Sequence, residues 1–139
     1  MTRTRIRTRT SDAVSDQGET MSNIAETLDT LLKTDGATSA AIVDSSSGML
    51  LGQAGSGLDL EVAAAGNTEV VRAKLKTIAA LGLDDTIDDI LITLTSQYHI
   101  IRPLAATPEV FIYLVLDSAK SNLALARINV KKADAALEL

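Results

Sequence analysis

Three apolar runs in the C-terminal half of the chain are joined by links too short to cross the face of a sheet. The runs are ILITLT, YHIIRPLA and VFIYLVLD, and the links are SQ and ATPE. Parallel neighbours need a crossover of about a dozen residues, so strands joined by such links are antiparallel. Apolar residues occupy both alternating faces of the runs, which is typical of sheets covered on both sides. The sequence therefore predicts a three-stranded antiparallel meander with helices on both faces.

The segments before the meander alternate between helical and strand patterns. Apolar residues at helical spacing follow Asn23, a residue type that caps helices, and Gly36 offers a stop. SAAIVD and MLLGQ are short apolar runs bounded by turn-forming residues, which indicates two strands. A long helix is predicted over residues 59–82, with Leu60, Ala64, Val71, Leu75 and Ile78 along one side.

A last helix follows the third run of the meander, with its cap at Ser118 or Ser121. The predicted order is helix, two strands, helix, three strands, helix. This order defines an α/β (α+β) fold with a mostly antiparallel five-stranded sheet. The long helix would measure roughly 35 Å, and the strands are nearer 20 Å. We therefore expect a further element to pack on the helix beyond the sheet.

Composition limits the classes of function. The chain has 139 residues, enough for one domain with a real core. It has no cysteine, which excludes thiolate metal sites and cysteine nucleophiles. A net charge of −5 and 2% aromatic residues argue against binding nucleic acid, through phosphate contacts or base stacking. No apolar run reaches the roughly 18 residues of a membrane span, so we expect no membrane insertion.

The first 21 residues differ from the rest of the chain. TRTRIRTRT alternates threonine with arginine, and SDAVSDQGET follows with almost nothing to bury. Four arginines face three carboxylates, so the segment is not a strongly basic arm. We predict that residues 1–21 form a disordered basic and polar tail, with Met21 as an alternative start, and that residues 22–139 form the domain.

Three features call for comparison with catalytic or metal sites, and none of them has the pattern of such a site. The loop DSSSG, residues 44–48, lacks the lysine and the following helix of a phosphate-binding loop, so it is predicted to be a hairpin tip. His99 has no evident acidic partner and no neighbouring ligand residues. The four aspartates at 84, 85, 88 and 89 lack the spacing of a calcium loop. We expect no catalytic residue, no metal site, no cofactor and no enzymatic activity.

The first strand of the meander has none of the usual protections of an edge strand. ILITLT, residues 90–95, contains no charge, no proline and no glycine. Such an edge tends to pair with another chain. We expect two copies to pair through it with their long helices side by side, which would also account for the excess length of the helix.

Four segments resemble the roadblock family of dynein-light-chain-type domains, especially its prokaryotic members. They are GATSAAIVDSSSGMLL, EVAAAGNTEVVRAKLKTIAALGL, ILITLTSQYHIIRPL and SNLALARINV, and the resemblance covers about residues 22–137. It implies a homodimer joined through the central helix and third strand, and a cytoplasmic platform for a small Ras-like GTPase. Some bacterial members stimulate GTP hydrolysis without supplying an arginine finger.

The resemblance implies two sets of contact residues. The dimer interface would contain Ala64, Asn67, Val71, Ile90, Leu91, Ile92, Thr93, Leu94 and Thr95. The GTPase would contact Val70, Arg72, Lys74 and Lys76. Two alternatives stay open: a scaffold for a signalling complex that leaves the nucleotide cycle unchanged, and a sensor of a small ligand.

Overall fold

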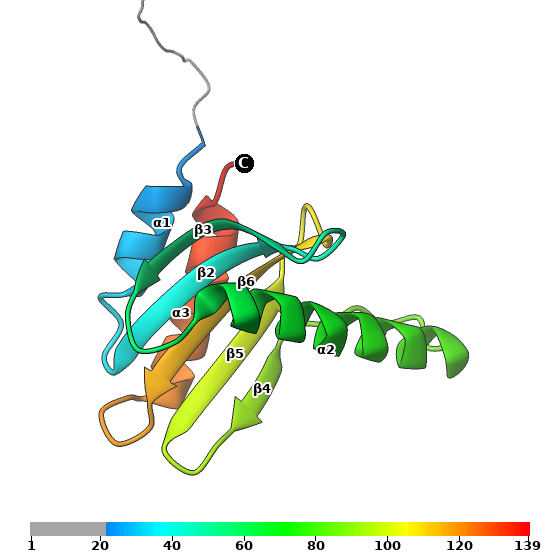
Figure 1. Ribbon diagram of the computed structural model, residues 1–139. Coiled ribbons are helices and arrows are strands. Elements are labelled where there is room, and N and C mark those ends of the chain that lie inside the picture. Colours follow the sequence, from blue (N-terminus) through cyan, green and yellow to red (C-terminus); the bar gives the residue numbers. More distant parts are fainter. Residues whose placement is uncertain (1–21) are drawn as a thin grey trace, which may run out of the picture.

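The computed structural model describes residues 22–139, which form three helices and five strands (Figure 1). In chain order the elements are α1 Ile24–Leu31, β2 Ala37–Asp44, β3 Met49–Gly55, α2 Leu60–Ala80, β4 Ile90–Thr93, β5 Gln97–Pro103, β6 Val110–Asp117 and α3 Leu123–Ala136. The order confirms the predicted succession. The prediction that residues 1–21 form a disordered tail lies outside the described residues.

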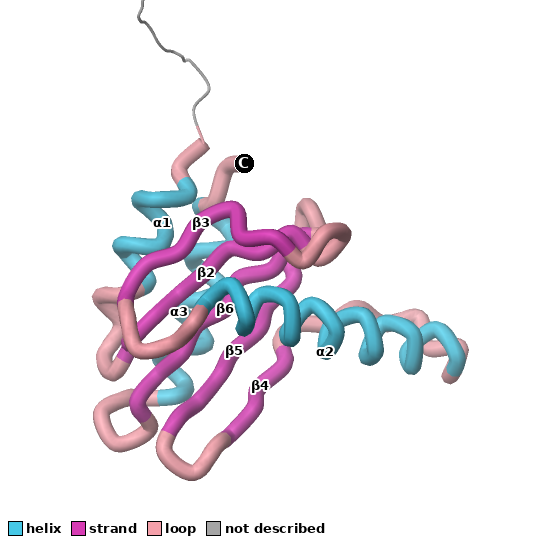
Figure 2. Tube along the Cα trace, in the orientation of Figure 1, coloured by secondary structure: helices cyan, strands magenta, loops and turns pink. Residues whose placement is uncertain are grey.

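The five strands make one sheet in the order β3-β2-β6-β5-β4, and every neighbouring pair is antiparallel. Helix α2 crosses one face, and α1 and α3 cover the other (Figures 1 and 2). The predicted fold class, with an antiparallel sheet and helices on both faces, is confirmed. The meander β4–β5–β6 leaves β4 at one edge, and β3 forms the other.

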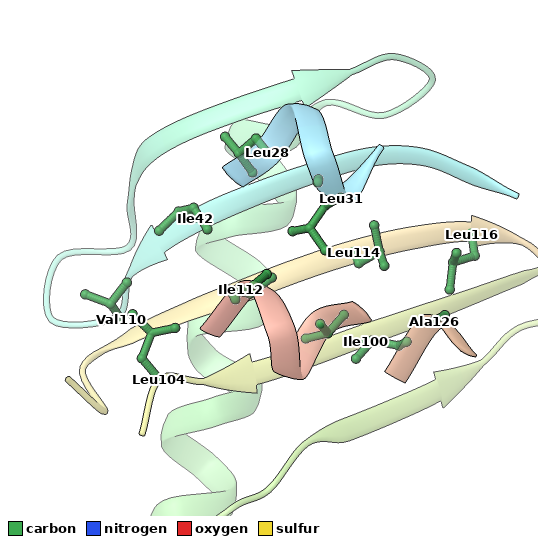
Figure 3. Close-up of a cluster of buried hydrophobic side chains, with 13 residues drawn as sticks. Leu28, Leu31, Ile42, Ile100, Leu104, Val110, Ile112, Leu114, Leu116 and Ala126 are labelled. Carbon is green, nitrogen blue, oxygen red and sulfur yellow. The ribbon is translucent and has the colours of Figure 1, made fainter. Parts of the chain in front are cut away.

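Strand β6 lies at the centre of the sheet and divides its side chains between the two cores. Ile112, Leu114 and Leu116 pack toward α1 and α3 (Figure 3), and Phe111 and Tyr113 pack toward α2. All five side chains are at most 1% exposed. This explains why the run has no charged residue before Asp117, since a central strand under helices on both faces has no side in water.

The loop after β2 is a hairpin tip, as predicted. The Asp44 carboxylate accepts hydrogen bonds from the backbone N–H of Ser46 at 2.9 Å and from its hydroxyl at 2.6 Å. These two bonds hold the pKa of Asp44 below its ordinary value. Gly48 ends the turn with φ of 77°, a conformation that strongly favours glycine.

The capping predictions were partly wrong. Asn23 precedes α1, but its side chain makes no cap hydrogen bond. It instead donates to the Ala136 carbonyl at 2.8 Å and accepts from the Glu138 N–H at 2.7 Å, which fastens the start of α1 to the end of α3. Helix α3 is capped by Asn122, not by a serine: its side chain accepts from Leu125 N–H at 3.0 Å.

Strand β4 is shorter than predicted. The run ILITLT was expected to be extended through Thr95, but β4 ends at Thr93. The Leu94 N–H donates to the Gln97 carbonyl at 2.8 Å, so the chain already turns at Leu94. Leu94 and Thr95 therefore belong to the β4–β5 turn and not to the strand edge.

The acidic connection before β4 is not simply solvated. Asp88 pairs with Arg102 of β5 at 2.8 Å, and the Arg102 guanidinium lowers the pKa of the Asp88 carboxyl. Asp89 accepts two hydrogen bonds from Arg127 of α3, at 2.8 and 3.0 Å. The other side of Arg102 donates to Asp134 at 2.8 Å. These pairs attach the segment leading into β4 to the α3 side of the sheet.

Within residues 22–139, none of the helices is both long enough and apolar enough to cross a bilayer.

Candidate partner-binding surface

Only the first half of α2 is buried by its own chain. Asp59 caps the helix by accepting from the N–H groups of Glu61 and Val62 at 3.1 and 3.2 Å. The last buried α2 side chain is Val71, and Leu75 is 45% exposed. Beyond that point the helix runs past the sheet (Figures 1 and 2). The excess length expected from the sequence is therefore present as an uncovered overhang.

A shallow groove of about 510 Å³ separates the middle of α2 from the start of β4. Its helical wall contains Val70, Ala73, Lys74 and Thr77, and Ile90 lies on the opposite wall with Asp89. Ile90 and Ile92 are only half-buried at the margin of the core beneath α2. The groove leaves apolar surface of the sheet uncovered next to its free edge.

The two edges of the sheet differ in regularity. The β2–β3 ladder shifts register between Ile42 and Val43, whose partners are Gly52 and Leu50, so that Leu51 is a bulge. Bulges twist an edge and hinder pairing with another strand. The β4–β5 ladder keeps its register from Ile90 to Thr93. Of the two edges, β4 is the one fit for further pairing.

The hydrogen-bonding direction of each β4 residue follows from the turn. Because Leu94 N–H donates toward β5, and N–H groups of successive strand residues point to opposite sides, the N–H groups of Thr93 and Leu91 point outward. In the sheet formed by residues 22–139, no strand lies beyond β4. Two backbone donors are thus presented along a regular, uncharged edge.

Small residues follow the groove side of α2. Val70, Ala73 and Thr77 line the groove, and Gly66 and Ala63 precede them at spacings of four and three residues, which places them on the same side. A methyl group built on Gly66 would meet nothing within 4 Å. A glycine in the middle of a helix permits the close approach of another backbone. No other described part of the chain makes such an approach.

A chain of polar side chains lies beneath α2 beside the uncovered strands. The His99 ring accepts from Tyr113 O–H through Nδ1 at 3.0 Å and donates through Nε2 to the Gln97 side-chain oxygen at 2.8 Å. An oxygen partner at Nε2 requires the proton on that nitrogen, which leaves Nδ1 as the acceptor. Burial lowers the pKa of His99, so the ring is neutral at neutral pH.

Burial also raises the pKa of Tyr113, and a hydrogen bond from Asn67 of α2 opposes that change. This series of hydrogen-bonded side chains therefore connects α2 to β6 and β5. His99 thus makes its hydrogen bonds within its own chain.

Arg72 is engaged within the chain. Its guanidinium donates to the carbonyls of Ser45 and Ser46 in the hairpin tip at 2.7 and 3.0 Å and pairs with Glu69 at 3.3 Å. The side chain is still 48% exposed, so one side of it faces solvent. Arg72 fixes the hairpin tip against the middle of α2. Among residues 22–139, no group of three or more His, Asp and Glu side chains is arranged to hold a metal ion.

Comparisons with known proteins give the fold a name. No protein-family model matches the chain, and no curated protein matches it. Among solved structures, MglB of Myxococcus xanthus superposes with a TM-score of 0.73 at 21% identity, over 84% of this chain and 93% of that one. The gliding protein MglB of Thermus thermophilus gives 0.70 at 17% identity, over 81% and 83%. A Roadblock/LC7 domain from Streptomyces avermitilis gives 0.69 at 12% identity, over 79% and 90%.

The chain has the roadblock fold. Identities this low establish the fold and leave the activity to be argued from the surface itself.

The roadblock fold places the predicted contact residues in three different environments. Ala64 and Val71 are at most 1% exposed and pack between α2 and their own sheet.

The remaining predicted residues lie around the groove or beside it. Val70 and Lys74 line it, and Lys76 lies on the outer side of α2, exposed. Ile90, Leu91, Ile92 and Thr93 form the free edge, whereas Leu94 is a half-exposed residue of the adjoining turn. Asn67 contacts Tyr113. A contact role for these residues stays a prediction.

Sequence reasoning missed the small-residue side of α2 at Ala63, Ala73 and Thr77. A signal was present, because alanine and glycine at spacings of three and four residues mark a helix side that can approach another helix closely. The hydrogen bonds of Gln97 and Tyr113 to His99 were also missed. The alternation of strand faces places Tyr113 and His99 on one side of the sheet, but only the observed β5–β6 register brings them together.

Proposed function

We propose that the chain is a non-catalytic homodimeric roadblock protein that binds a small Ras-like GTPase and regulates its nucleotide cycle. The observation that carries the proposal is the uncovered pair of elements formed by the regular β4 edge and the overhanging half of α2. In one copy of residues 22–139, no strand lies beyond β4 and no element covers the second half of α2. The two lie next to each other across the groove. A second copy related by a two-fold axis would complete both.

In the proposed dimer, two β4 strands pair antiparallel and join two five-stranded sheets into one. The outward N–H groups of Leu91 and Thr93 supply the donors. The same axis brings the two α2 helices alongside each other over the paired strands. Exposed Leu75 and Leu81, at 45% and 64%, would then cover the half-buried Ile90 and Ile92 of the partner.

The small-residue side of α2 sets how closely the two helices approach. Gly66 has no neighbour for a side chain in its own copy, and glycine in the middle of a helix costs about 1 kcal/mol relative to alanine. A backbone of the partner passing over Gly66 would offset that cost. This is the close approach that the isolated chain lacks.

The GTPase would bind across the outer face of the paired helices. Lys76 and the solvent-facing side of Arg72 are exposed there, with Lys74 at the groove. Because Arg72 is held by two carbonyls of the hairpin tip, it serves as a fixed contact and not as an arginine finger. Regulation would follow from higher affinity for one conformation of the GTPase switch loops. A cytoplasmic location is part of this proposal.

The proposal is tested by capture of a small GTPase encoded beside this gene, loaded with GDP or with a non-hydrolysable GTP analogue. We expect preferential capture of one form and a changed rate of GTP hydrolysis on addition of the chain. Lys76→Glu should weaken capture, and Lys120→Glu, at an exposed site in the turn before α3, should not. Equal capture of both forms with unchanged hydrolysis would leave only the scaffold role. No capture of either form would refute GTPase binding.

A further inference from the structure

A second groove lies on the opposite face of the sheet, between α1 and α3. Its volume is about 600 Å³, which is within the range of small-molecule pockets of roughly 300–1,000 Å³. Leu31 and Ala133 form its apolar floor. The helices run antiparallel, joined at one end by Asn23 and at the other by a hydrogen bond from Asn129 to Thr34 at 3.1 Å. The walls are therefore fixed at both ends.

Thr27 lines this groove from α1. It is only 6% exposed. A hydroxyl on the wall of a groove can donate to an oxygen of a bound ligand, and hydrogen bonds to charged groups are stronger than those between neutral groups.

Thr34 adds a second available donor. Its side-chain oxygen accepts from Asn129, which leaves its own hydroxyl proton to be donated, and it is also 6% exposed. The two threonines are about two helical turns apart, with Thr34 just beyond the end of α1, and both line the groove. Together they present hydroxyl groups at two heights along one wall.

Two lysines line the groove, one from each side. Lys33 comes from the end of α1 and Lys132 from α3, near the Thr34–Asn129 contact. Neither ammonium is in an ion pair with a carboxylate of residues 22–139, in contrast to Lys131, which lies 3.9 Å from Asp88. Glu26 lines the opposite end, beside Asn23. The groove is thus cationic and rich in donors at one end only.

We propose that the α1–α3 groove binds a small molecule through a carboxylate or phosphate group. Lys33 and Lys132 pair with the anionic group from both walls. Thr27 and Thr34 donate to its oxygens or to neighbouring hydroxyls, and the body of the ligand lies over Leu31 and Ala133. Because the groove is on the far side of the sheet from α2, this site does not depend on dimer formation or on a GTPase.

Such a ligand contacts α1 and α3 together and therefore stabilises the folded chain by mass action. The experiment measures the melting temperature of the full chain with sodium phosphate, glycerol 3-phosphate, succinate or citrate, each against sodium chloride of equal ionic strength. We expect at least one of these anions to raise the melting temperature in a saturable manner. A response to the phosphates alone or to the carboxylates alone identifies the head group.

Variants separate binding from general effects of salt. Lys33→Gln and Lys132→Gln should each weaken the apparent affinity about tenfold, the typical effect of removing a charge-assisted hydrogen bond. Lys131→Gln, one residue away on α3, is the matched control and should keep the response. Thr27→Val should also weaken binding, because it removes a hydroxyl donor from the groove wall and keeps a side chain of nearly the same shape.

The proposal is overturned if no anion of the panel exceeds the chloride control. It is equally overturned if the Lys33→Gln, Lys132→Gln double variant responds as the unmodified chain does.

Discussion

Replacing Thr93 by proline removes a backbone donor from the outer edge of β4 and leaves the hydrogen bonds between β4 and β5 in place. The Thr93 N–H points away from β5, since the neighbouring Leu94 N–H donates to Gln97 of β5. Proline lacks this N–H, and its ring would occupy the place where a paired strand approaches. Proline is tolerated on edge strands when the missing N–H faces solvent. The variant should therefore keep its fold and lose its self-association.

The magnitude follows from the symmetry of the proposed pairing. A net hydrogen bond contributes about 1 kcal/mol, and the two-fold axis removes one from each copy, so the dimer loses about 2 kcal/mol. At 1.4 kcal/mol per factor of ten, the dissociation constant rises roughly thirtyfold from the hydrogen bonds alone. The carbonyl of the partner strand, left buried without a donor, and the displacement caused by the ring both add to this loss.

Sedimentation equilibrium across a dilution series measures the effect directly, with circular dichroism and thermal melting as checks on folding. Thr93→Ala is the matched control, because it removes the same side chain but keeps the N–H, and it should associate nearly as tightly as the unmodified chain. The reasoning fails if Thr93→Pro is folded and associates with unchanged affinity. It also fails if the unmodified chain is monomeric at every concentration.

Three further predictions concern Gly66, Tyr113 and Asp88. Gly66→Ala should raise the free energy of unfolding of the single chain by about 0.5–1 kcal/mol in urea titrations. Gly66→Leu should weaken self-association, because its side chain would hold the two helices apart. A Gly66→Leu variant that associates normally would exclude a close helix contact at this position. Tyr113→Phe leaves His99 Nδ1 without its donor and should cost about 1–3 kcal/mol, and Tyr98→Phe, at a half-buried site, should cost much less. The pKa of Asp88 lies below its ordinary value of 3.8 in the folded chain, so its pair with Arg102 contributes fully above that pH and is lost as the pH falls through the lowered value. Melting temperatures of Asp88→Asn should accordingly depend less on pH below about pH 4 than those of the unmodified chain, and equal slopes would contradict the pairing.

The elements that are determined by neighbouring residues could be predicted from the sequence. The links SQ and ATPE force an antiparallel meander, and Asp44 with Gly48 defines a hairpin tip. The end of β4 could not be predicted in this way, because the strand pattern of ILITLT continues to Thr95 and no residue in it signals a turn. The turn at Leu94 is imposed by the pairing of β4 with β5, which fixes where the hairpin closes. The end of a strand that is set by pairing with another strand cannot be predicted from the residues of that strand alone.

The polar contacts that were missed join residues far apart in the sequence. Arg102 is 14 residues from Asp88 and 32 from Asp134, and Arg72 is 27 residues from Ser45. A charged residue on a strand or helix gives no sign of which distant carbonyl or carboxylate it will reach. The groove between α1 and α3 is of the same kind, since its two walls are separated by the whole sheet in the sequence.

Folding and association are separable in this chain because both cores are complete in one copy. Phe111, Tyr113 and Val115 beneath α2 are at most 1% exposed without any partner, as are Ile112 and Leu114 on the other face. The uncovered surface is confined to the β4 edge, the α2 overhang and the apolar margin between them. A second copy therefore adds stability to a domain that already has a core, and a variant that blocks pairing leaves a folded monomer. That monomer should still bind an anion between α1 and α3, since none of the groove residues belongs to the pairing surface.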